Sequence, residues 1–174
     1  WMVSSEDVND TVLFYFSGHG DPDGYLGPYD AYYARTWISS RELSSWLSPL
    51  ESERVVIILD TCYAGKYERE LSGSGRVVLL SSGADEYSYS GEDGGAFTYY
   101  LLEALSEFSI TDANLDYELS AEELFQYAEP ETISETTDFY INGKLQDVQH
   151  PVLSDDYSGE LSLLLKFIFN TEPG

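Results

Sequence analysis

Three stretches of the chain are almost continuously apolar and rich in β-branched and aromatic residues: 11–16 (TVLFYF), 54–59 (RVVIIL) and 76–80 (RVVLL). None of them alternates between apolar and polar positions, as a strand with one face in water would. Such runs are typical of parallel strands that are covered on both faces. The pattern therefore predicts three buried strands of one parallel sheet.

Two stretches with a helical period accompany these strands. Ser39 to Glu42 (SSRE) has the sequence of a capping box, and apolar residues follow it at helical spacing: Leu43, Trp46, Leu47 and Leu50. After Gly94-Gly95 comes a second apolar stripe: Phe97, Tyr100, Leu101, Ala104, Leu105 and Phe108. Strands that alternate with helices predict an α/β fold, here a three-layer α/β/α sandwich with a mainly parallel sheet.

The C-terminal part of the chain is less regular. Residues 139–145 place an Asn-Gly turn between apolar residues and predict a hairpin, and 161–169 (LSLLLKFIF) predicts a last strand. The rest of 130–150 predicts no element. We expect residues 1–174 to form a single domain. Because 1–3 (WMV) resembles the end of a helix and a strong strand follows almost at once, we expect the chain to begin inside that domain.

The charge balance limits the partners. The chain has 32 acidic and 8 basic residues and a net charge of -24, so it would repel nucleic acid and anionic membranes. Cations, basic peptides or a high-salt environment suit it better, and solubility alone is the simplest reason for such acidity. No apolar run approaches the roughly 20 residues of a membrane span. With one cysteine, Cys62, no internal disulfide can form.

Two reactive side chains follow predicted strands. The first strand leads into Ser17-Gly18-His19-Gly20, and the second leads into Asp60-Thr61-Cys62. If these strands are parallel, the imidazole and the thiol emerge at the same edge of the sheet, where sites of open α/β sheets form. An imidazole helps a thiol to lose its proton and become a nucleophile, and glycines let a substrate approach closely. Either residue alone reads more simply as a structural loop histidine or a buried small residue, but the pair favours catalysis.

A second candidate site is an acidic loop. From Asp112 as position 1, oxygen-bearing residues occupy the ligand positions of an EF-hand calcium loop: Asp112, Asn114, Asp116, Glu118, Ser120 and Glu123. Tyr117 stands at position 6, where glycine is expected because the turn needs a positive φ. The substitution predicts weakened affinity or a loop that has lost the ion. The simpler interpretation is an acidic helix cap, since Ser120 and Glu123 also match a capping box.

Other polar residues near the strand ends are more ambiguous. Asp60 stands two residues before the cysteine and could receive a basic side chain, or could bond nearby backbone amides. Asp85 and Glu86 follow the third strand and read mainly as solvated loop acids. His150 reads as a loop residue before Pro151.

The strings VLFYFSGHG and VVIILDTCYAG resemble the caspase-like cysteine peptidases: caspases, metacaspases, legumains and their bacterial and archaeal relatives. In that group one apolar strand ends in His-Gly, and the next ends in a short acidic-x-Cys-x-x-Gly stretch. Residues 24–31 and 79–105 also resemble these relatives, as does a calcium-type loop after the second helix, which some prokaryotic members carry. The resemblance covers about residues 1–130. It implies a caspase-like fold whose first strand and helices are missing here, so a separate N-terminal portion of the same domain becomes a candidate partner.

The resemblance also implies roles for residues of this chain. His19 would be the catalytic histidine, Cys62 the nucleophile, and the backbone amides of Gly20 and Cys62 the oxyanion hole. Asp60, with help from Asp85, would line a pocket for the substrate side chain before the cleaved bond. The expected activity is an endopeptidase for peptide or protein substrates that cleaves after Arg or Lys, with calcium as its only cofactor.

One alternative from another functional class stays open. The chain could be a non-catalytic, calcium-stabilised module of a surface or scaffold protein that keeps the caspase-like fold. The compartment is equally open, because one unpaired cysteine fits a reducing cytosol while acidity and a weak calcium loop fit an exterior rich in calcium, which we slightly favour.

Overall fold

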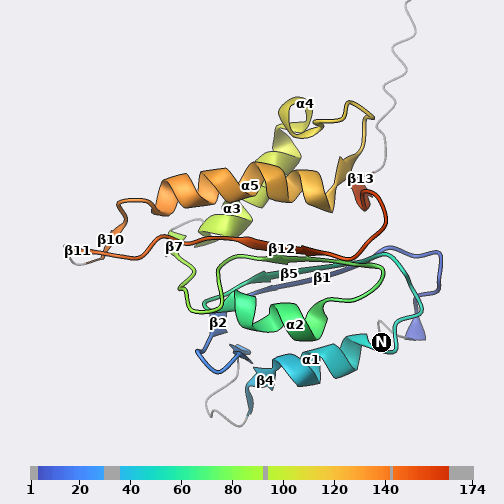
Figure 1. The fold of residues 1–174 in the computed structure, drawn as a ribbon, viewed down its shortest axis with the longest axis horizontal. Coiled ribbons are helices and arrows are strands. Elements are labelled where there is room, and N and C mark those ends of the chain that lie inside the picture. The colour runs from blue at the N-terminus through green and yellow to red at the C-terminus, as the bar shows by residue number, and fades with distance from the viewer. Residues whose placement is uncertain (1–3, 30–35, 92–93, 142, 165–174) are drawn as a thin grey trace, which may run out of the picture.

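The computed structural model describes residues 4–29, 36–91, 94–141 and 143–164 (Figure 1). Its centre is a four-stranded sheet in the order β1 (Val12–Ser17), β5 (Val55–Asp60), β6 (Arg76–Leu80), β12 (Val152–Asp155). The first three strands are parallel, and β12 pairs antiparallel with β6. The three predicted strands and the mainly parallel sheet are confirmed, whereas β12 was not predicted.

Helices cover both faces of this sheet and make three layers. In Figure 1, α3 (Ala96–Ser106) and α5 (Ala121–Thr136) lie on one face, and α1 (Ser40–Leu47) and α2 (Glu68–Leu71) lie on the other. Alternate residues of β5 serve the two cores: Val56 and Ile58 pack on the α3 and α5 side, while Ile57 and Leu59 pack on the α1 and α2 side. The predicted α/β/α sandwich is therefore confirmed.

Side-chain caps begin two of the helices. Ser39 and Glu42 form the predicted capping box of α1, and Ser120 and Glu123 form the same arrangement at α5. The apolar stripe predicted over 97–108 spans two helices, because α3 ends at Ser106 and the short α4 (Phe108–Thr111) follows it. No helix in the described ranges is long and apolar enough to cross a bilayer.

The other strands are short and form small sheets outside the central one. β10 (Tyr140–Ile141) and β11 (Lys144–Leu145) form the predicted hairpin. The remaining pairings join β2 (His19–Gly20), β3 (Tyr25–Gly27) and β4 (Ile38–Ser39), then β7 (Ser90–Gly91) with β8 (Gly94–Gly95), and β9 (Leu119–Ser120) with β13 (Ser162–Leu164). The short 3₁₀ helix η3 (Ala64–Tyr67) follows β5.

One detail of the expected fold is wrong. β1 is not covered on both faces, since Leu13 is 53% and Tyr15 46% exposed. In the described part of the chain β1 is an edge strand, and the apolar run alone cannot distinguish an edge from a centre. The expected last strand is present in the described residues as β13 (Ser162–Leu164), which pairs with β9 and not with the main sheet. Residues 165–169 of that expected strand, and the helix end expected at 1–3, lie outside the described residues.

Candidate active site

The pairing of β1 with β5 brings His19 and Cys62 to one edge of the sheet. In the register, Ser17, the last residue of β1, lies opposite Asp60, the last residue of β5. His19 and Cys62 each follow two residues later, and the Gly18 amide continues the ladder with a hydrogen bond to the Asp60 carbonyl (3.1 Å). The predicted imidazole and thiol therefore leave adjacent strands at matching positions.

The backbone after His19 packs directly against the cysteine loop. A Cβ placed on Gly20 would overlap the Cys62 carbonyl oxygen and Thr61 Oγ1. Only glycine permits this approach without a shift of the backbone. Contact between β2 and the cysteine loop is thus built into the fold.

The two candidate catalytic residues differ in exposure. Cys62 is half-buried and His19 is exposed. The Cys62 Sγ donates a hydrogen bond to the Ser88 carbonyl oxygen (3.6 Å). Tyr63, the next residue, takes a left-handed conformation (φ 58°), which turns the chain sharply into η3. The cysteine therefore stands on a tight bend between a buried strand and a helix.

Asp60 lies beneath this bend with both oxygens engaged. It is 3% exposed. Its Oδ1 accepts from the Ser88 hydroxyl (2.7 Å), and its Oδ2 accepts from the Thr98 amide (3.0 Å) and hydroxyl (2.6 Å). The N-cap residue of α3, Gly95, offers no side chain, so Asp60 caps that helix from across the core. The simpler interpretation of Asp60, a strand-end residue that bonds backbone amides, matches the contact with the Thr98 amide, while the other two contacts are with hydroxyls.

The acids after β6 differ from each other. The Asp85 side chain is exposed and pairs with Lys66 Nζ (2.7 Å). Glu86 instead accepts from the Gly83 amide (3.0 Å) and the His150 amide (2.9 Å), and it contacts His150 Nδ1 (2.8 Å). Burial acts to raise the pKa of Glu86, but these hydrogen bonds and the His150 ring together hold it below its ordinary value. The expectation that Glu86 is a solvated loop acid is therefore wrong, whereas His150 is, as expected, an exposed loop residue, here one that bonds Glu86.

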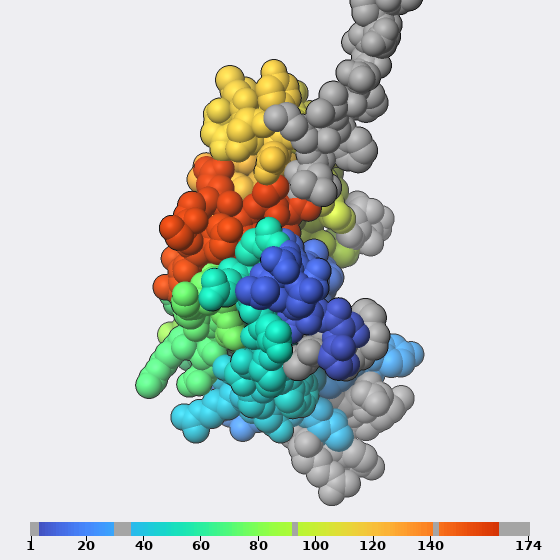
Figure 2. All heavy atoms as spheres, turned by 90° about the vertical axis from the view of Figure 1, so that its right-hand side faces the viewer, coloured from blue at the N-terminus to red at the C-terminus, as the bar shows by residue number. Residues whose placement is uncertain are grey.

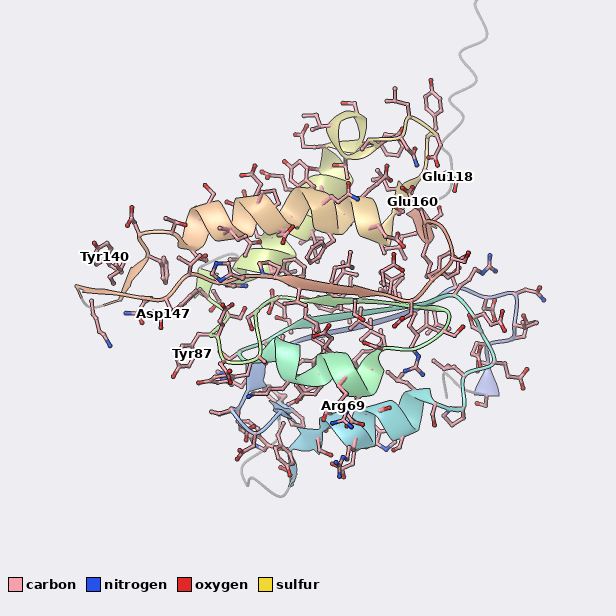
Figure 3. All side chains as sticks on the ribbon, viewed as in Figure 1. Arg69, Tyr87, Glu118, Tyr140, Asp147 and Glu160 are labelled. Carbon is pink, nitrogen blue, oxygen red and sulfur yellow. The ribbon has the colours of Figure 1, made fainter. Side chains whose placement is uncertain are left out.

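The acidic loop 112–123 lies at the opposite end of the domain. Figure 3 shows Glu118 and Glu160 far from Tyr87, which neighbours Ser88 of the cysteine site. Figure 2 views this far end and shows the loop (yellow) above the segment around 155–161 (red). The two predicted sites are therefore separate, and no residue of the loop adjoins the thiol.

The loop has a positive-φ turn at position 6, as the spacing of a calcium loop requires, and a second one that the spacing did not predict. Tyr117 adopts a positive φ of 67°, and Leu115 one of 62°. Asp112 accepts from the amides of Asp116 (3.1 Å) and Tyr117 (3.1 Å), and Asp116 accepts from the Glu118 amide (2.8 Å). These contacts fold the loop back on itself.

Glu123 and Glu160 extend the cluster of acids. Glu123 accepts from the amides of Ala113 (2.9 Å) and Ser120 (3.1 Å), and Glu160, which the spacing did not reveal, accepts from Asn114 Nδ2 (2.6 Å). Burial and the charges of Glu123 and Asp116 raise the pKa of Glu160. The donors are all oxygen, which suits calcium. Within the described ranges, however, no three His, Cys, Asp or Glu side chains are gathered to hold an ion.

Two residues of the cysteine site could not be found by sequence reasoning. Ser88 contacts both the thiol and Asp60, and the buried Gln149 donates to Ser88 Oγ (3.3 Å). Ser88 lies in the stretch 79–105 that resembles the family, but the sequence indicated no role for it, and Gln149 lies in the stretch 130–150 that showed no pattern. Their only signal is their position in space.

Comparison with known proteins supports the resemblance that the two strand-end motifs suggested. No curated protein matches the chain. The profile of the Caspase domain matches residues 1–153, which include both strand ends, α3, α5 and the acidic loop. That family supports a cysteine peptidase that acts on peptide or protein substrates. By this match over most of its length, the chain belongs to the Caspase domain family of cysteine peptidases.

Proposed function

We propose that the chain is a cysteine endopeptidase in which Cys62 is the nucleophile and His19 the general acid and base. The observation that carries the proposal is the β1–β5 register, which sets both residues two positions beyond a paired Ser17 and Asp60. The close approach of Gly20 to the Cys62 backbone supports it, because the histidine strand and the cysteine loop are in contact. His19 is exposed, so its ring is accessible to a substrate from solvent.

The proposed reaction has two steps. His19 accepts the thiol proton, and the Cys62 thiolate attacks the carbonyl carbon of the scissile bond. As the C–N bond breaks, His19 returns this proton to the leaving amine and an acyl-enzyme remains. His19 then takes a proton from water, the hydroxide attacks the acyl carbon, and the C–S bond breaks to release the carboxylic acid product. The thiolate of Cys62 takes the proton back from His19.

Two backbone amides are available for the oxyanion. In β2–β3 the Asp21 amide bonds the Tyr25 carbonyl (3.1 Å), so the adjoining Gly20–Leu26 pair is a non-hydrogen-bonded one. The Gly20 amide therefore points away from β3. The Cys62 amide has no acceptor among the described residues. Free amides beside a nucleophile are what an oxyanion hole requires.

We further propose that the substrate residue before the cleaved bond is Arg or Lys. The net charge of -24 attracts basic peptides, and Asp60 and Asp85 flank the cysteine loop. A carboxylate can accept about four hydrogen bonds. Asp60 accepts three, two at Oδ2 and one at Oδ1, so Oδ1 keeps room for one more. The exposed Asp85 would add long-range attraction.

A fluorogenic peptide assay tests the activity and the preference together. We expect hydrolysis after Arg or Lys and none after Asp, and we expect Cys62→Ala to abolish it. His19→Ala should lower kcat by about 10²–10⁴-fold. Because Cys62 is the chain's single cysteine, a thiol-reactive peptide that ends in Arg should label the wild type and leave Cys62→Ala unlabelled. Turnover that survives in Cys62→Ala would refute the mechanism.

Calcium binding by residues 112–123 is a separate proposal. The oxygen donors and the two positive-φ bends fit such a loop, although its carboxylates would have to turn from backbone amides toward the ion. Asp112, Asn114, Asp116 and Glu123 would hold the ion through side chains, Glu118 through its carbonyl, and Ser120 directly or through water. Since the loop is remote from the thiol, calcium would act by stabilising the start of α5.

Calorimetric titration with calcium tests this proposal, with thermal unfolding as a second measurement. Calcium should raise the unfolding temperature of the wild type, and Glu123→Gln should remove the effect. Glu131→Gln, an exposed position on the same helix, is the matched control and should respond like the wild type. If neither heat nor unfolding temperature responds to calcium, the loop is only a helix cap.

The alternative, a non-catalytic module, is favoured by one observation. The thiol and Asp60 find hydrogen-bond partners within the chain, so the site is satisfied without a substrate. The peptide assay separates the two proposals: a module would neither cleave any basic or acidic peptide nor be labelled at Cys62 by a substrate-like peptide.

A further inference from the structure

The segment that follows β6, residues 81–89, surrounds the cysteine loop. Ser81 Oγ accepts from the Thr61 amide (3.0 Å), Ser82 Oγ accepts from the Ala64 amide (3.1 Å), and the Glu86 carbonyl accepts from the Tyr63 amide (2.7 Å). Ser88 then meets the thiol itself. The position of Cys62 therefore depends on where this segment lies.

Gln149 holds both ends of the 81–89 segment. It is completely buried, and both the oxygen and the nitrogen of its carboxamide are hydrogen-bonded. Nε2 donates to the Ser81 carbonyl (2.7 Å) and to Ser88 Oγ (3.3 Å), while Oε1 accepts from the Tyr89 amide (2.9 Å). The backbone N–H of Gln149 donates a hydrogen bond to Thr136 Oγ1 (3.1 Å), at the end of α5.

The chemistry of these contacts requires a neutral carboxamide. Ser88 uses its only hydroxyl proton for Asp60, so its oxygen can only accept from Gln149. The Ser81 carbonyl also needs a donor, and the Tyr89 amide needs an acceptor. A glutamate of the same size would set a carboxylate against two oxygens.

His150, the next residue, holds the middle of the same segment. Its amide and its Nδ1 both contact the Glu86 carboxylate, whose second role is to accept from the Gly83 amide. Gln149 and His150 thus fix the segment at Ser81, Glu86 and Ser88, from a part of the chain outside both strand-end motifs.

We propose that Gln149 and His150 are positioning residues for Cys62: they hold the 81–89 segment so that the Ser88 carbonyl orients the thiol and the Ser88 hydroxyl orients Asp60. The expected effect of these residues on turnover rests on the proposed peptidase activity. Their effect on the thiol is independent of any substrate.

The test compares Gln149→Glu, Gln149→Met and His150→Ala with Gln146→Glu as the matched control. Gln146 lies in the same stretch, but its side chain donates to the Lys144 carbonyl (2.6 Å), away from the cysteine. Two readouts are used: kcat and KM for an Arg peptide, and the rate of alkylation of the single cysteine by iodoacetamide as a function of pH.

We expect Gln149→Glu to lower kcat at least tenfold with a smaller change in KM, because the thiol is misaligned while peptide binding remains. The added charge should also move the alkylation profile to higher pH, since a nearby carboxylate disfavours the thiolate. Gln149→Met and His150→Ala should change the alkylation rate without that charge effect, and Gln146→Glu should match the wild type in both readouts.

The proposal is overturned if folded Gln149 variants keep the wild-type kcat and alkylation profile. Should both Gln149 variants fail to unfold cooperatively, the more exposed His150→Ala decides, and an unchanged alkylation rate there overturns the proposal. If the wild type cleaves no peptide but the variants still alter alkylation, the peptidase proposal fails while the positioning role stands.

Discussion

Two glycines determine how closely the segments of the site approach one another. Gly20 lies against the Cys62 carbonyl, and a Cβ on Gly95 would overlap the Asp60 carboxylate. At both positions, atoms of another segment occupy the space that a Cβ on the glycine would take. The histidine strand, the cysteine loop and the start of α3 therefore converge because these residues lack side chains.

Gly20→Ala should reduce the free energy of unfolding by about 1–3 kcal/mol, because the new methyl group collides with backbone that cannot move freely. Gly91→Ala is the control, since beyond its chain neighbours no heavy atom of the described residues lies within 4 Å of a Cβ placed there, and its φ is not in the left-handed region; we expect a change within about 0.5 kcal/mol. Urea unfolding followed by circular dichroism measures both. Equal stability of the two variants would contradict the close contact.

Replacement of the two aspartates at the site should have very different effects on the free energy of unfolding. Asp60→Asn replaces an acceptor with a donor and leaves the Ser88 hydroxyl or the Thr98 groups unpaired, so we expect a loss of about 1–3 kcal/mol. Asp85→Asn removes only an exposed ion pair with Lys66 and should change stability by less than about 0.5 kcal/mol. Thermal unfolding of both variants checks this, and a stable Asp60→Asn would show that the carboxylate is not a structural anchor.

At the scale of elements, α5 connects the two ends of the domain. It begins at the capping box of the acidic loop and ends at Thr136, where the Gln149 amide is bonded. Pro130 lies inside this 16-residue helix. Proline removes one backbone hydrogen bond and crowds the carbonyl four residues earlier, so the helix forms through packing on α3 and the sheet in spite of its sequence.

Pro130→Ala should therefore raise the free energy of unfolding by about 1–2 kcal/mol, which is the helix-interior cost of proline less its restriction of the unfolded chain. Pro130 is exposed, so the change opens no cavity in the core. Glu131→Ala on the same exposed helix surface is the control and should stay within about 0.5 kcal/mol. A loss of stability in Pro130→Ala, measured in urea, would contradict this account of the helix.

At the scale of the whole molecule, the pH dependence of stability depends on carboxylates whose pKa the fold shifts. Two glutamates are shifted in opposite directions. Glu122 is buried and its oxygens accept from the Leu161 amide (3.2 and 3.0 Å). Burial raises its pKa, with help from the charges of Asp155 and Glu160 and against the backbone hydrogen bonds. Glu86 is shifted the other way, below its ordinary value.

These opposite shifts predict opposite slopes. When the folded state raises a pKa, the group stabilises the fold at pH values below its ordinary pKa of 4.5, and this stabilisation is lost as the pH rises through the folded pKa. The wild type should therefore lose stability relative to Glu122→Gln between pH 4 and 7. A lowered folded pKa gives stability above 4.5 that is lost in acid. Glu86→Gln should thus be less stable than wild type at pH 7, with a difference that shrinks in acid. Urea unfolding across this range checks both signs, and parallel curves would contradict them.

Much of the fold and the central pair of the site could be predicted because the signals are local. Continuous apolar runs indicated β1, β5 and β6, Ser39 and Glu42 indicated the start of α1, and the strand ends indicated His19 and Cys62 as a pair. The same kind of reasoning indicated the capping box at the start of α5 but missed the extent of this helix, whose proline argues against it, and it missed β12, whose four residues carry little pattern.

The sequence by itself determined which residues could be reactive and which strands would carry them, since periodicity, caps and turn residues act over a few neighbours. Only the tertiary structure decided that β1 lies at an edge, that Asp60 caps α3, and that Gln149 and His150 hold the segment over Cys62. Those contacts join residues 38–68 positions apart in the chain. Hydrogen bonds of this kind leave no local pattern, because any polar residue could make them until packing fixes its neighbours.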